Sequence, residues 1–413
     1  MKLRVGGLVK GGYAVARSPS GTVLVTGALP GEEVTARPAG RHGGAALARC
    51  VRVIEASPER RDAPCPMYDE CGGCDLQHAR YEAQVAYKRG ILEDCLRRLG
   101  KLAEWPAIAV VPSPELGYRR RVRLHVSPGA GSIALGYYRR GSRAVAPLGG
   151  PCPILTPVLA GLVEGIRRDE HALLDRCGEI TLLEGDGAHS AVVRVSGRGA
   201  PQRRAIASWL EPLGVADLAV VGDGEEIEAH AGGVPIRAGQ ATVWASARCF
   251  FQGNAPLLEA LASEALRSAP ERPFRLWDLH AGVGLFSAAV GARAREIACV
   301  EADPQAIPLL TRNAGGRRAR IFEGTDAAFL RRHEPAPDLC IVDPPRSGLT
   351  RDVREDLARV HPPLVTIVGC DPAALATDAG ALIRSGYRLT SIAMLDLFPQ
   401  SAHVEAVLHL EAV

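Results

Sequence analysis

Long apolar runs are missing from this sequence of 413 residues. No stretch approaches the roughly 18 apolar residues of a membrane-spanning helix, which argues against a membrane role. The first residues, MKLRVGGLVKGG, contain no apolar signal core, so we expect a cytoplasmic protein in a reducing compartment. Paired cysteines in such a compartment bind metals more often than they form disulfides. The eleven cysteines of the chain therefore indicate chemistry rather than crosslinks.

A strong net charge is also missing. The formal charge of +3 is too small to indicate a nucleic-acid partner by itself, but basic residues gather in YRRRVRLH at 118–125 and in YYRRGSR at 137–143. Arginines beside tyrosines offer phosphate contacts next to stacking surfaces, which suits irregular or single-stranded RNA. A solvated strand face explains either segment alone equally well.

Internal repeats and low-complexity tracts are absent too, and the length predicts about two to four domains. Residues 1–57 carry short β-branched runs separated by turn residues, which is typical of a small β-barrel. RNA contacts and an ordinary polar barrel surface explain four of its arginines equally well: Arg37, Arg41, Arg49 and Arg52. Residues 58–240 mix strand-like runs with a helix that we expect from Tyr81 to Leu99, ended by Gly100. This middle segment predicts an α+β domain whose helix, at about 79–100, is free to pack on the domain that follows.

From residue 241 to 413, short apolar runs alternate with helix-like stretches, which predicts an open, largely parallel α/β sheet. In such sheets the ligand crevice lies beyond the carboxyl ends of the strands, so the residues after each run are the candidates for a binding site. Four acids stand at or just beyond the ends of successive runs: Asp278, Glu301, Asp326 and Asp343.

These acids predict a nucleoside cofactor. Asp278 precedes a glycine turn with Gly282 and Gly284, but a dinucleotide fingerprint has a third glycine where this chain has Ser287. Glu301 can accept hydrogen bonds from both ribose hydroxyls of a smaller cofactor. A single acid of this kind is more often a helix cap, but four at successive strand ends make S-adenosylmethionine the best candidate.

Two reactive side chains belong to the same half of the chain. TIVGCDP puts Cys370 at the end of a strand, at the predicted cofactor edge, whereas an unpaired cysteine is most often buried and inert. Glu405 enters a later strand directly after His403, where a solvated carboxylate is the ordinary alternative. Together, Cys370 and Glu405 suggest a nucleophile and a base.

A cluster of cysteines marks the middle of the chain. CPMYDECGGCDLQH contains Cys65, Cys71 and Cys74, with no fourth cysteine nearby. Thiolates bind structural zinc and iron–sulfur clusters equally well, and the spacing leaves the choice open.

Five motifs give the chain a resemblance to a known family. FFQGN at 250–254, DLHAGVG, VDPPRSG, GCDP and DLFPQSAHVE occur in the order found in the RNA (uracil-5-)-methyltransferases, specifically the iron–sulfur branch that acts on 23S ribosomal RNA. The resemblance implies an N-terminal TRAM domain, which is an OB-like barrel, and a C-terminal Rossmann-like class I methyltransferase. The implied partner is 23S ribosomal RNA, with transfer RNA as the alternative, and we expect a monomer.

The resemblance also implies a role for each candidate residue. Cys152 becomes the fourth ligand of a four-iron, four-sulfur cluster, with Cys370 as nucleophile and Glu405 as base. The implied cofactor residues are Gln252, His280, Gly282, Glu301, Asp326 and Asp343.

The chain departs from the family at two motifs. His280 and Ala281 replace a Tyr-Cys pair, and Gly369 and Asp371 flank Cys370 where the family has Ser and Asn. We expect the Asp371 charge to raise the pKa of the Cys370 thiol and slow its attack. An RNA-binding iron–sulfur protein with impaired catalysis is therefore the alternative. An amino-group methyltransferase ranks last, because it predicts an aromatic residue in place of Arg346 and leaves Cys370 without a role.

Overall fold

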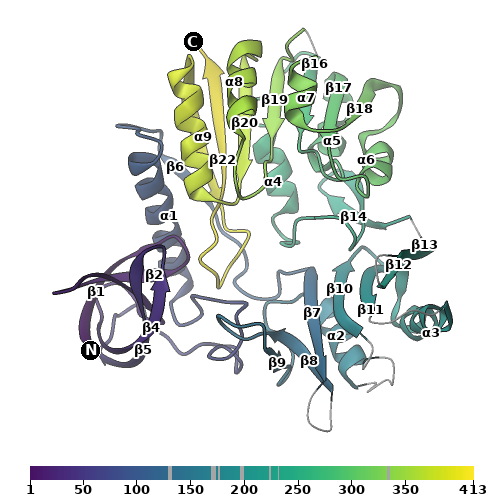
Figure 1. Ribbon diagram of the computed structural model, residues 1–413. Coiled ribbons are helices and arrows are strands. Elements are labelled where there is room, and N and C mark those ends of the chain that lie inside the picture. The colour runs from purple at the N-terminus through teal and green to yellow at the C-terminus, as the bar shows by residue number, and fades with distance from the viewer. Residues whose placement is uncertain are drawn as a thin grey trace.

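The computed structural model describes residues 1–128, 133–168, 174, 177–195, 200–222, 225–230, 232–332 and 335–413. A barrel, a central sheet and a C-terminal sheet follow one another along the chain, in purple, blue to teal and green to yellow in Figure 1. The barrel and the central sheet lie on the same side of the C-terminal sheet, below it in that view.

The N-terminal barrel has five strands: β1 (Lys2–Val9), β2 (Tyr13–Ser18), β3 (Gly21–Thr26), β4 (Glu33–His42) and β5 (Ala45–Glu55). Their order is β1-β2-β3-β5-β4, and pairing of β1 with β4 closes the barrel. Because successive side chains of a strand face opposite sides, Leu3 and Val5 of β1 point inward between exposed neighbours. The predicted β-barrel is confirmed.

The central sheet combines antiparallel strands with two helices. Its elements are β7 (Arg121–Pro128), β8 (Ile133–Tyr138), β9 (Val145–Pro147), α2 (Pro157–Arg168), β10 (Cys177–Glu184), β11 (His189–Val195), α3 (Ala200–Leu210), η2 (Glu211–Leu213), β12 (Val215–Gly222) and β13 (Glu225–His230). The strand order is β13-β12-β11-β10-β7-β8-β9, with only β11 and β12 parallel among these described pairs. Leu159 and Ile166 of α2 are fully buried in the core of this sheet. The hairpin of β14 (Val234–Ala238) and β15 (Ala241–Ala245) follows.

The C-terminal sheet is the predicted open α/β sheet. Its elements are α4 (Leu258–Ala265), β16 (Phe274–Leu279), α5 (Leu285–Val290), η3 (Gly291–Arg293), β17 (Ala294–Glu301), α6 (Ile307–Ala314), η4 (Gly316–Arg318), β18 (Ala319–Glu323), α7 (Asp326–Leu330), β19 (Leu339–Val342), α8 (Arg351–Val360), β20 (Leu364–Gly369), α9 (Pro372–Arg384), β21 (Tyr387–Leu395) and β22 (Glu405–Ala412). The order is β18-β17-β16-β19-β20-β22-β21-β6, and β22 runs antiparallel to both of its neighbours. Two apolar clusters cover its two faces, as a parallel sheet requires.

An early segment of the chain joins this C-terminal sheet. The predicted helix is α1 (Tyr81–Arg98), and it packs with α9 in one apolar cluster. The next strand, β6 (Ile108–Val111), forms the edge of the sheet beside β21. A Cβ on Gly100 would lie 2.7 Å from Leu96 O and 2.9 Å from Ala376 O, so glycine allows α1 to end in close contact with α9. Within the described ranges, no helix is long and apolar enough to cross a membrane.

Candidate active site

The carboxyl ends of the parallel strands bring several predicted site residues to one edge of the C-terminal sheet. Asp278 is next to last in β16 and Glu301 is last in β17, while Asp343 follows β19 and Cys370 follows β20. These strands are consecutive neighbours in the order β17-β16-β19-β20. The polar end of each strand therefore faces the same crevice.

The loop after β16 presents its backbone to open space. Gly282 and Gly284 have φ angles of 55° and 87°, in the left-handed region that favours glycine. Among the atoms that the structure describes, none lies within 4 Å of a Cβ built on Gly282. Glu301 holds this loop, because its Oε2 accepts a hydrogen bond from Gly282 N at 2.7 Å, and its Oε1 accepts from Ala302 N and Asp303 N, each at 2.7 Å. A ligand can approach the backbone here, and the Glu301 carboxylate retains lone pairs for it.

His280 and Asp326, which the resemblance implies as cofactor residues, form an ion pair with each other. His280 Nε2 lies 2.5 Å from Asp326 Oδ2, and Asp326 opens α7 after the N-cap Thr325. Burial by itself would lower the pKa of His280, but the hydrogen bond to Asp326 and the nearby carboxylates together raise that pKa above its ordinary value. The pair places a basic imidazole among the acids of this edge.

Ser287 stands where a dinucleotide fingerprint has its third glycine, and its side chain takes part in a hydrogen bond that glycine could not form. It donates to Asp278 Oδ2 from its backbone N at 3.1 Å and from its Oγ at 2.5 Å. Burial raises the pKa of Asp278 to about 6, although both hydrogen bonds from Ser287 lower it. Asp278 therefore ties the first turn of α5 to β16.

The antiparallel pairing of β20 with β22 brings Glu405 next to Cys370. Gly369, the last residue of β20, pairs with Ala406, the second residue of β22. Glu405 is 2% exposed, and in the part of the chain that the structure describes neither of its carboxylate oxygens has a hydrogen-bond partner. Leaving a buried carboxyl unpaired is costly in free energy. A buried carboxyl group without a partner, in spite of this cost, is typical of a group that acts on a substrate.

Burial and neighbouring acids raise the pKa values of both candidate groups. Burial first, and the Asp343 charge second, raise the pKa of Glu405 well above its ordinary value, while Arg346 opposes the shift. The pKa of Cys370 rises to about 11, first through burial and then through the Glu405 charge. Arg346 lowers the pKa of Cys370 by its charge and by a hydrogen bond to the thiol. Arg346 is a site residue that the sequence pattern does not reveal, beyond its place after the Pro pair.

The Asp371 carboxylate is bound by two other parts of the chain. Its Oδ1 accepts hydrogen bonds from Ala373 N and Ala374 N, both at 3.0 Å, and so caps α9. Its Oδ2 pairs with Lys10 Nζ of the barrel. Burial and Glu405 are the main causes of the raised pKa of Cys370. The Asp371 charge is thus already engaged by a helix N-terminus and a cation, and its effect on the Cys370 thiolate stays a prediction.

Gln252 lies in the extended segment between β15 and α4, and it is 7% exposed. The residues that follow it are fixed from two sides. Gly253 O accepts from Arg120 N at 2.8 Å, and Asn254 Nδ2 donates to Ser113 Oγ at 2.9 Å and to Leu397 O at 3.2 Å. This segment therefore links the central sheet to the loop before Glu405.

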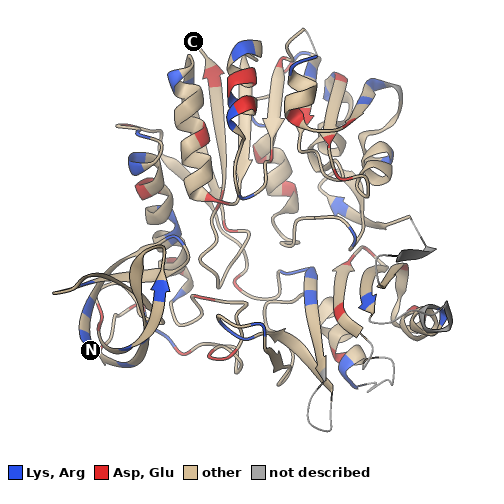
Figure 2. Ribbon diagram, in the orientation of Figure 1, with Lys and Arg blue, Asp and Glu red and all other residues tan. Residues whose placement is uncertain are grey.

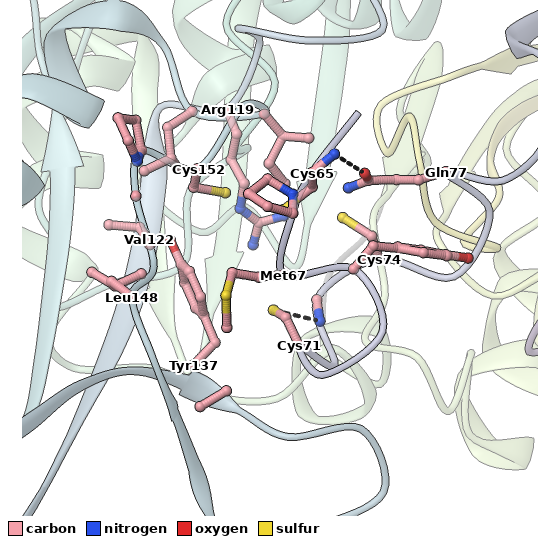
Figure 3. Close-up of a pocket in the computed structure, with 18 of the residues that line it drawn as sticks. Cys65, Met67, Cys71, Cys74, Gln77, Arg119, Val122, Tyr137, Leu148 and Cys152 are labelled. Carbon is pink, nitrogen blue, oxygen red and sulfur yellow. Dashed lines mark hydrogen bonds between the residues drawn. The ribbon is translucent and has the colours of Figure 1, made fainter. Parts of the chain in front are cut away.

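The predicted cluster ligands line one cavity of about 160 Å³. Cys65, Cys71 and Cys74 come from a single turn, and Cys152 comes from the segment after β9. Figure 3 shows the thiols of Cys71, Cys74 and Cys152 directed toward the same space, with Met67 beside them. The two segments meet because Gly72 N donates to Tyr138 O at 2.9 Å, which docks the turn on β8.

Burial first, and neighbouring thiolates after it, raise the pKa values of Cys65, Cys71 and Cys74. For Cys74 these causes together raise the pKa to about 12, against a hydrogen bond from Gln77. Among the described residues, however, no group of three His, Cys, Asp or Glu side chains is placed to hold a metal ion. A single zinc ion would need the sulfurs roughly 3.8 Å apart, as tetrahedral bonds of about 2.3 Å require. The four thiols that line the cavity are the donor set that either a zinc ion or an iron–sulfur cluster requires.

Comparison with known proteins identifies the family. The family model described as tRNA (Uracil-5-)-methyltransferase matches residues 322–413. The 23S rRNA (uracil(1939)-C(5))-methyltransferase RlmD of Pseudomonas entomophila is 32% identical over 416 residues, covering 97% of this chain and 91% of that protein. The chain belongs to the RNA (uracil-5-)-methyltransferase family. The RlmD protein of Chromohalobacter salexigens is 36% identical over 436 residues, covering 98% of this chain and 87% of that protein.

A solved structure of similar fold supports the architecture. The crystal structure of Pyrococcus abyssi tRNA (uracil-54, C5)-methyltransferase in complex with S-adenosyl-L-homocysteine matches with a TM-score of 0.73 at 21% identity, covering 99% of this chain and 100% of that chain. The expected succession of TRAM-like barrel, central domain and Rossmann-like sheet is thus confirmed as the fold of this family member.

The two basic segments contribute less free charge than their sequence suggests. Figure 2 shows Lys and Arg residues along β7. Arg121 donates to Cys249 O at 2.6 Å and to Ala247 O at 2.9 Å, and Arg140 is paired with Asp75 at 3.1 Å. These arginines hold segments of the protein together, whereas Arg123 remains 61% exposed in its side chain.

Proposed function

We propose that this protein transfers a methyl group from S-adenosylmethionine to carbon 5 of a uridine in 23S ribosomal RNA. The observation that carries the proposal is the placement of the Cys370 thiol beside the unpartnered, buried carboxyl group of Glu405. The choice of RNA follows the names of the two bacterial relatives. We further propose that the protein acts as a monomer in the cytoplasm.

The two reactive side chains would act in sequence. Cys370 loses its proton to solvent and adds through Sγ to carbon 6, and the electrons of the C5–C6 double bond move toward the C4 carbonyl as an enolate. S-adenosylmethionine supplies an electrophilic methyl group, which carbon 5 takes as the sulfur–methyl bond breaks. Glu405 then removes the proton from carbon 5. The electrons of that C–H bond restore the C5–C6 double bond, and Cys370 leaves carbon 6 as a thiolate.

The environment of these groups suits this order. A carboxylate whose pKa is raised is a stronger base, so burial favours Glu405 as the acceptor of the carbon 5 proton. Arg346 opposes the raised pKa values of both Glu405 and Cys370 and so promotes their ionised forms. The target uridine has to leave its base stack to reach this buried edge.

We propose Gln252, Gly282, Glu301 and Asp343 as cofactor residues, with His280 and Asp326 acting as a pair. Glu301 would accept hydrogen bonds from the ribose hydroxyls while it keeps the Gly282 loop in place. The open space at Gly282 leaves room for the methionine part.

Substitution of Glu301 by Ala is expected to weaken S-adenosylmethionine binding by about 1 to 3 kcal/mol, because charge-assisted hydrogen bonds to ribose are lost and the loop loses its anchor. Isothermal calorimetry with the purified protein measures this change. Glu323→Ala is the matched control, because Glu323 lies opposite Glu301 in the neighbouring strand β18 and its side chain is exposed. Equal affinity in wild type and Glu301→Ala would remove Glu301 from the cofactor site.

We also propose that Cys65, Cys71, Cys74 and Cys152 bind a four-iron, four-sulfur cluster. Methyl transfer involves no electron transfer, so the cluster would crosslink the turn at 65–74 to the segment after β9. Its cationic iron would offset the repulsion between the thiolates.

Anaerobically purified protein is therefore expected to be brown with about four irons per chain, and Cys152→Ala is expected to lose most of this iron. Iron analysis and the visible absorption spectrum give the readout. Cys50→Ala, which removes a barrel cysteine away from the cavity, should keep the full iron content. Stoichiometric zinc without iron in anaerobic preparations would refute the cluster.

Nucleoside mass spectrometry tests the proposed function. RNA from cells without the protein should lose 5-methyluridine at one 23S ribosomal position, and the purified protein with S-adenosylmethionine should restore it. Loss from transfer RNA alone would assign the activity to the other substrate. Unchanged 5-methyluridine in both RNAs would overturn the proposal.

A further inference from the structure

The loop between β21 and β22, residues 396–404, leads into Glu405 and is hydrogen-bonded to several other parts of the chain. In Figure 1 this loop extends from the yellow end of the sheet toward the blue segments. Lys88 of α1, fully buried, donates to Asp396 Oδ1 at 2.6 Å and to Phe398 O at 2.8 Å. Tyr118 donates its hydroxyl to Pro399 O at 2.8 Å. The base is therefore located by contacts that originate outside its own strand.

Gln400 is the centre of this arrangement. It is fully buried, and its φ of 68° is left-handed, which is uncommon for any residue except glycine. Its backbone N donates to Gln84 Oε1 at 2.9 Å, and its Oε1 accepts from Gln84 Nε2 at 3.0 Å and from Arg61 at 3.4 Å. Its Nε2 donates to Glu115 O at 3.1 Å and to Glu115 Oε2 at 3.2 Å. A strained backbone persists only where its surroundings fix it. Here the backbone N and both polar atoms of the Gln400 side chain form hydrogen bonds.

The remaining polar atom of Gln400 connects it to the cysteine turn. Its carbonyl oxygen accepts from Asp75 N at 2.8 Å and from Leu76 N at 2.9 Å. Asp75 follows Cys74 directly, and its Oδ2 also accepts from Ala402 N at 3.4 Å. The residue next to Cys74 thus donates a hydrogen bond to Gln400, and Gln400 lies five residues before Glu405 along the chain.

We propose that Gln400 is a positioning residue, which fixes the Glu405 carboxyl group by tying its loop to the turn that carries Cys74. The proposal rests on the proposed function, because it assigns Glu405 the removal of the carbon 5 proton. Gln400 itself does not contact the reacting atoms. It acts by keeping the 396–404 loop in one conformation, so that the carboxylate stays in place to remove the carbon 5 proton.

The test is Gln400→Ala, with 23S ribosomal RNA fragments and S-adenosylmethionine as substrates. A shift of the base by about 1 Å costs on the order of 100-fold in rate, so we expect kcat to fall about 10- to 100-fold. Cys370 and the cofactor loop are anchored elsewhere, so methylated RNA should accumulate as a covalent adduct with Cys370 on denaturing gels, and the affinity for S-adenosylmethionine should stay within about twofold. A general loss of structure would reduce adduct and turnover together.

Two further variants keep the proposal testable if Gln400→Ala folds poorly. Gln84→Ala leaves Gln400 in place but removes two of its hydrogen bonds, and it should give the same adduct in smaller amount. Tyr387→Phe is the matched control, because it removes a buried hydrogen bond, from the tyrosine hydroxyl to Pro362 O at 3.0 Å, at the opposite end of β21. It should behave as wild type.

Normal turnover in folded Gln400→Ala and Gln84→Ala, or turnover that falls without any adduct, would overturn the positioning role. If wild type makes no 5-methyluridine, or Glu405→Gln forms no adduct, the proposed function fails instead. The Glu405→Gln control therefore separates the two failures.

Discussion

Glu405→Gln is expected to lower turnover by about 10²- to 10⁴-fold and to accumulate a covalent RNA adduct that already carries the new methyl group. Gln has the shape of Glu but cannot accept the carbon 5 proton, so the steps through methyl transfer proceed and elimination stops. The adduct should appear as a slowly migrating band on a denaturing gel and should require S-adenosylmethionine for stable accumulation. Mass spectrometry of the digested band should find a methylated uridine linked to Cys370.

Two variants isolate the cause of this trapped species. The double variant Cys370→Ala, Glu405→Gln should form no adduct, because the thiol that makes the bond is absent. Glu411→Gln makes the same chemical change on the same strand at an exposed position paired with Arg388, and it should turn over normally. An adduct that forms fully without Cys370 would mean that the nucleophile is misassigned, and normal turnover of Glu405→Gln would mean that another group is the base.

Much of the fold follows from local sequence patterns. The helical spacing of apolar residues predicts α1 within one residue of its observed end, and the alternation of short apolar runs with helix-like stretches predicts the parallel sheet. The pattern cannot predict that β6, of four residues, completes this sheet beside β21. That pairing joins segments nearly 300 residues apart, and it depends on tertiary packing rather than on local preference.

The candidate site, like the fold, is predicted from the sequence only in part. Strand ends predict that Glu301, Asp343 and Cys370 share one edge, because parallel strands align their carboxyl ends. The contact between His280 and Asp326 is not predictable from the sequence. Their positions after strands indicate only that both lie at the same edge of the sheet. For Asp371, proximity along the chain to Cys370 does not determine where the carboxylate points.

Alkylation of Cys370 by iodoacetamide in the absence of RNA is expected to accelerate about tenfold per pH unit between pH 7 and 9. The thiolate is the reacting form, and the pKa of Cys370 is raised to about 11 by burial and by Glu405. Below the pKa the thiolate fraction therefore grows tenfold with each unit. Peptide mapping by mass spectrometry follows Cys370 separately from the other cysteines. A rate that levels off near pH 8 would contradict the raised pKa.

Substitution of neighbouring charges identifies which of them controls the thiol. Arg346→Met should slow alkylation roughly 3- to 10-fold at a given pH, because the arginine charge and its hydrogen bond lower the pKa of Cys370. Asp371→Asn should leave the rate within about twofold of wild type, since Asn also caps helices and the Asp371 charge is already engaged by Lys10. A large acceleration in Asp371→Asn would show that its charge reaches the thiol despite the Lys10 pair. An unchanged rate in Arg346→Met would instead mean that burial, Glu405 and Asp343 control the pKa of Cys370.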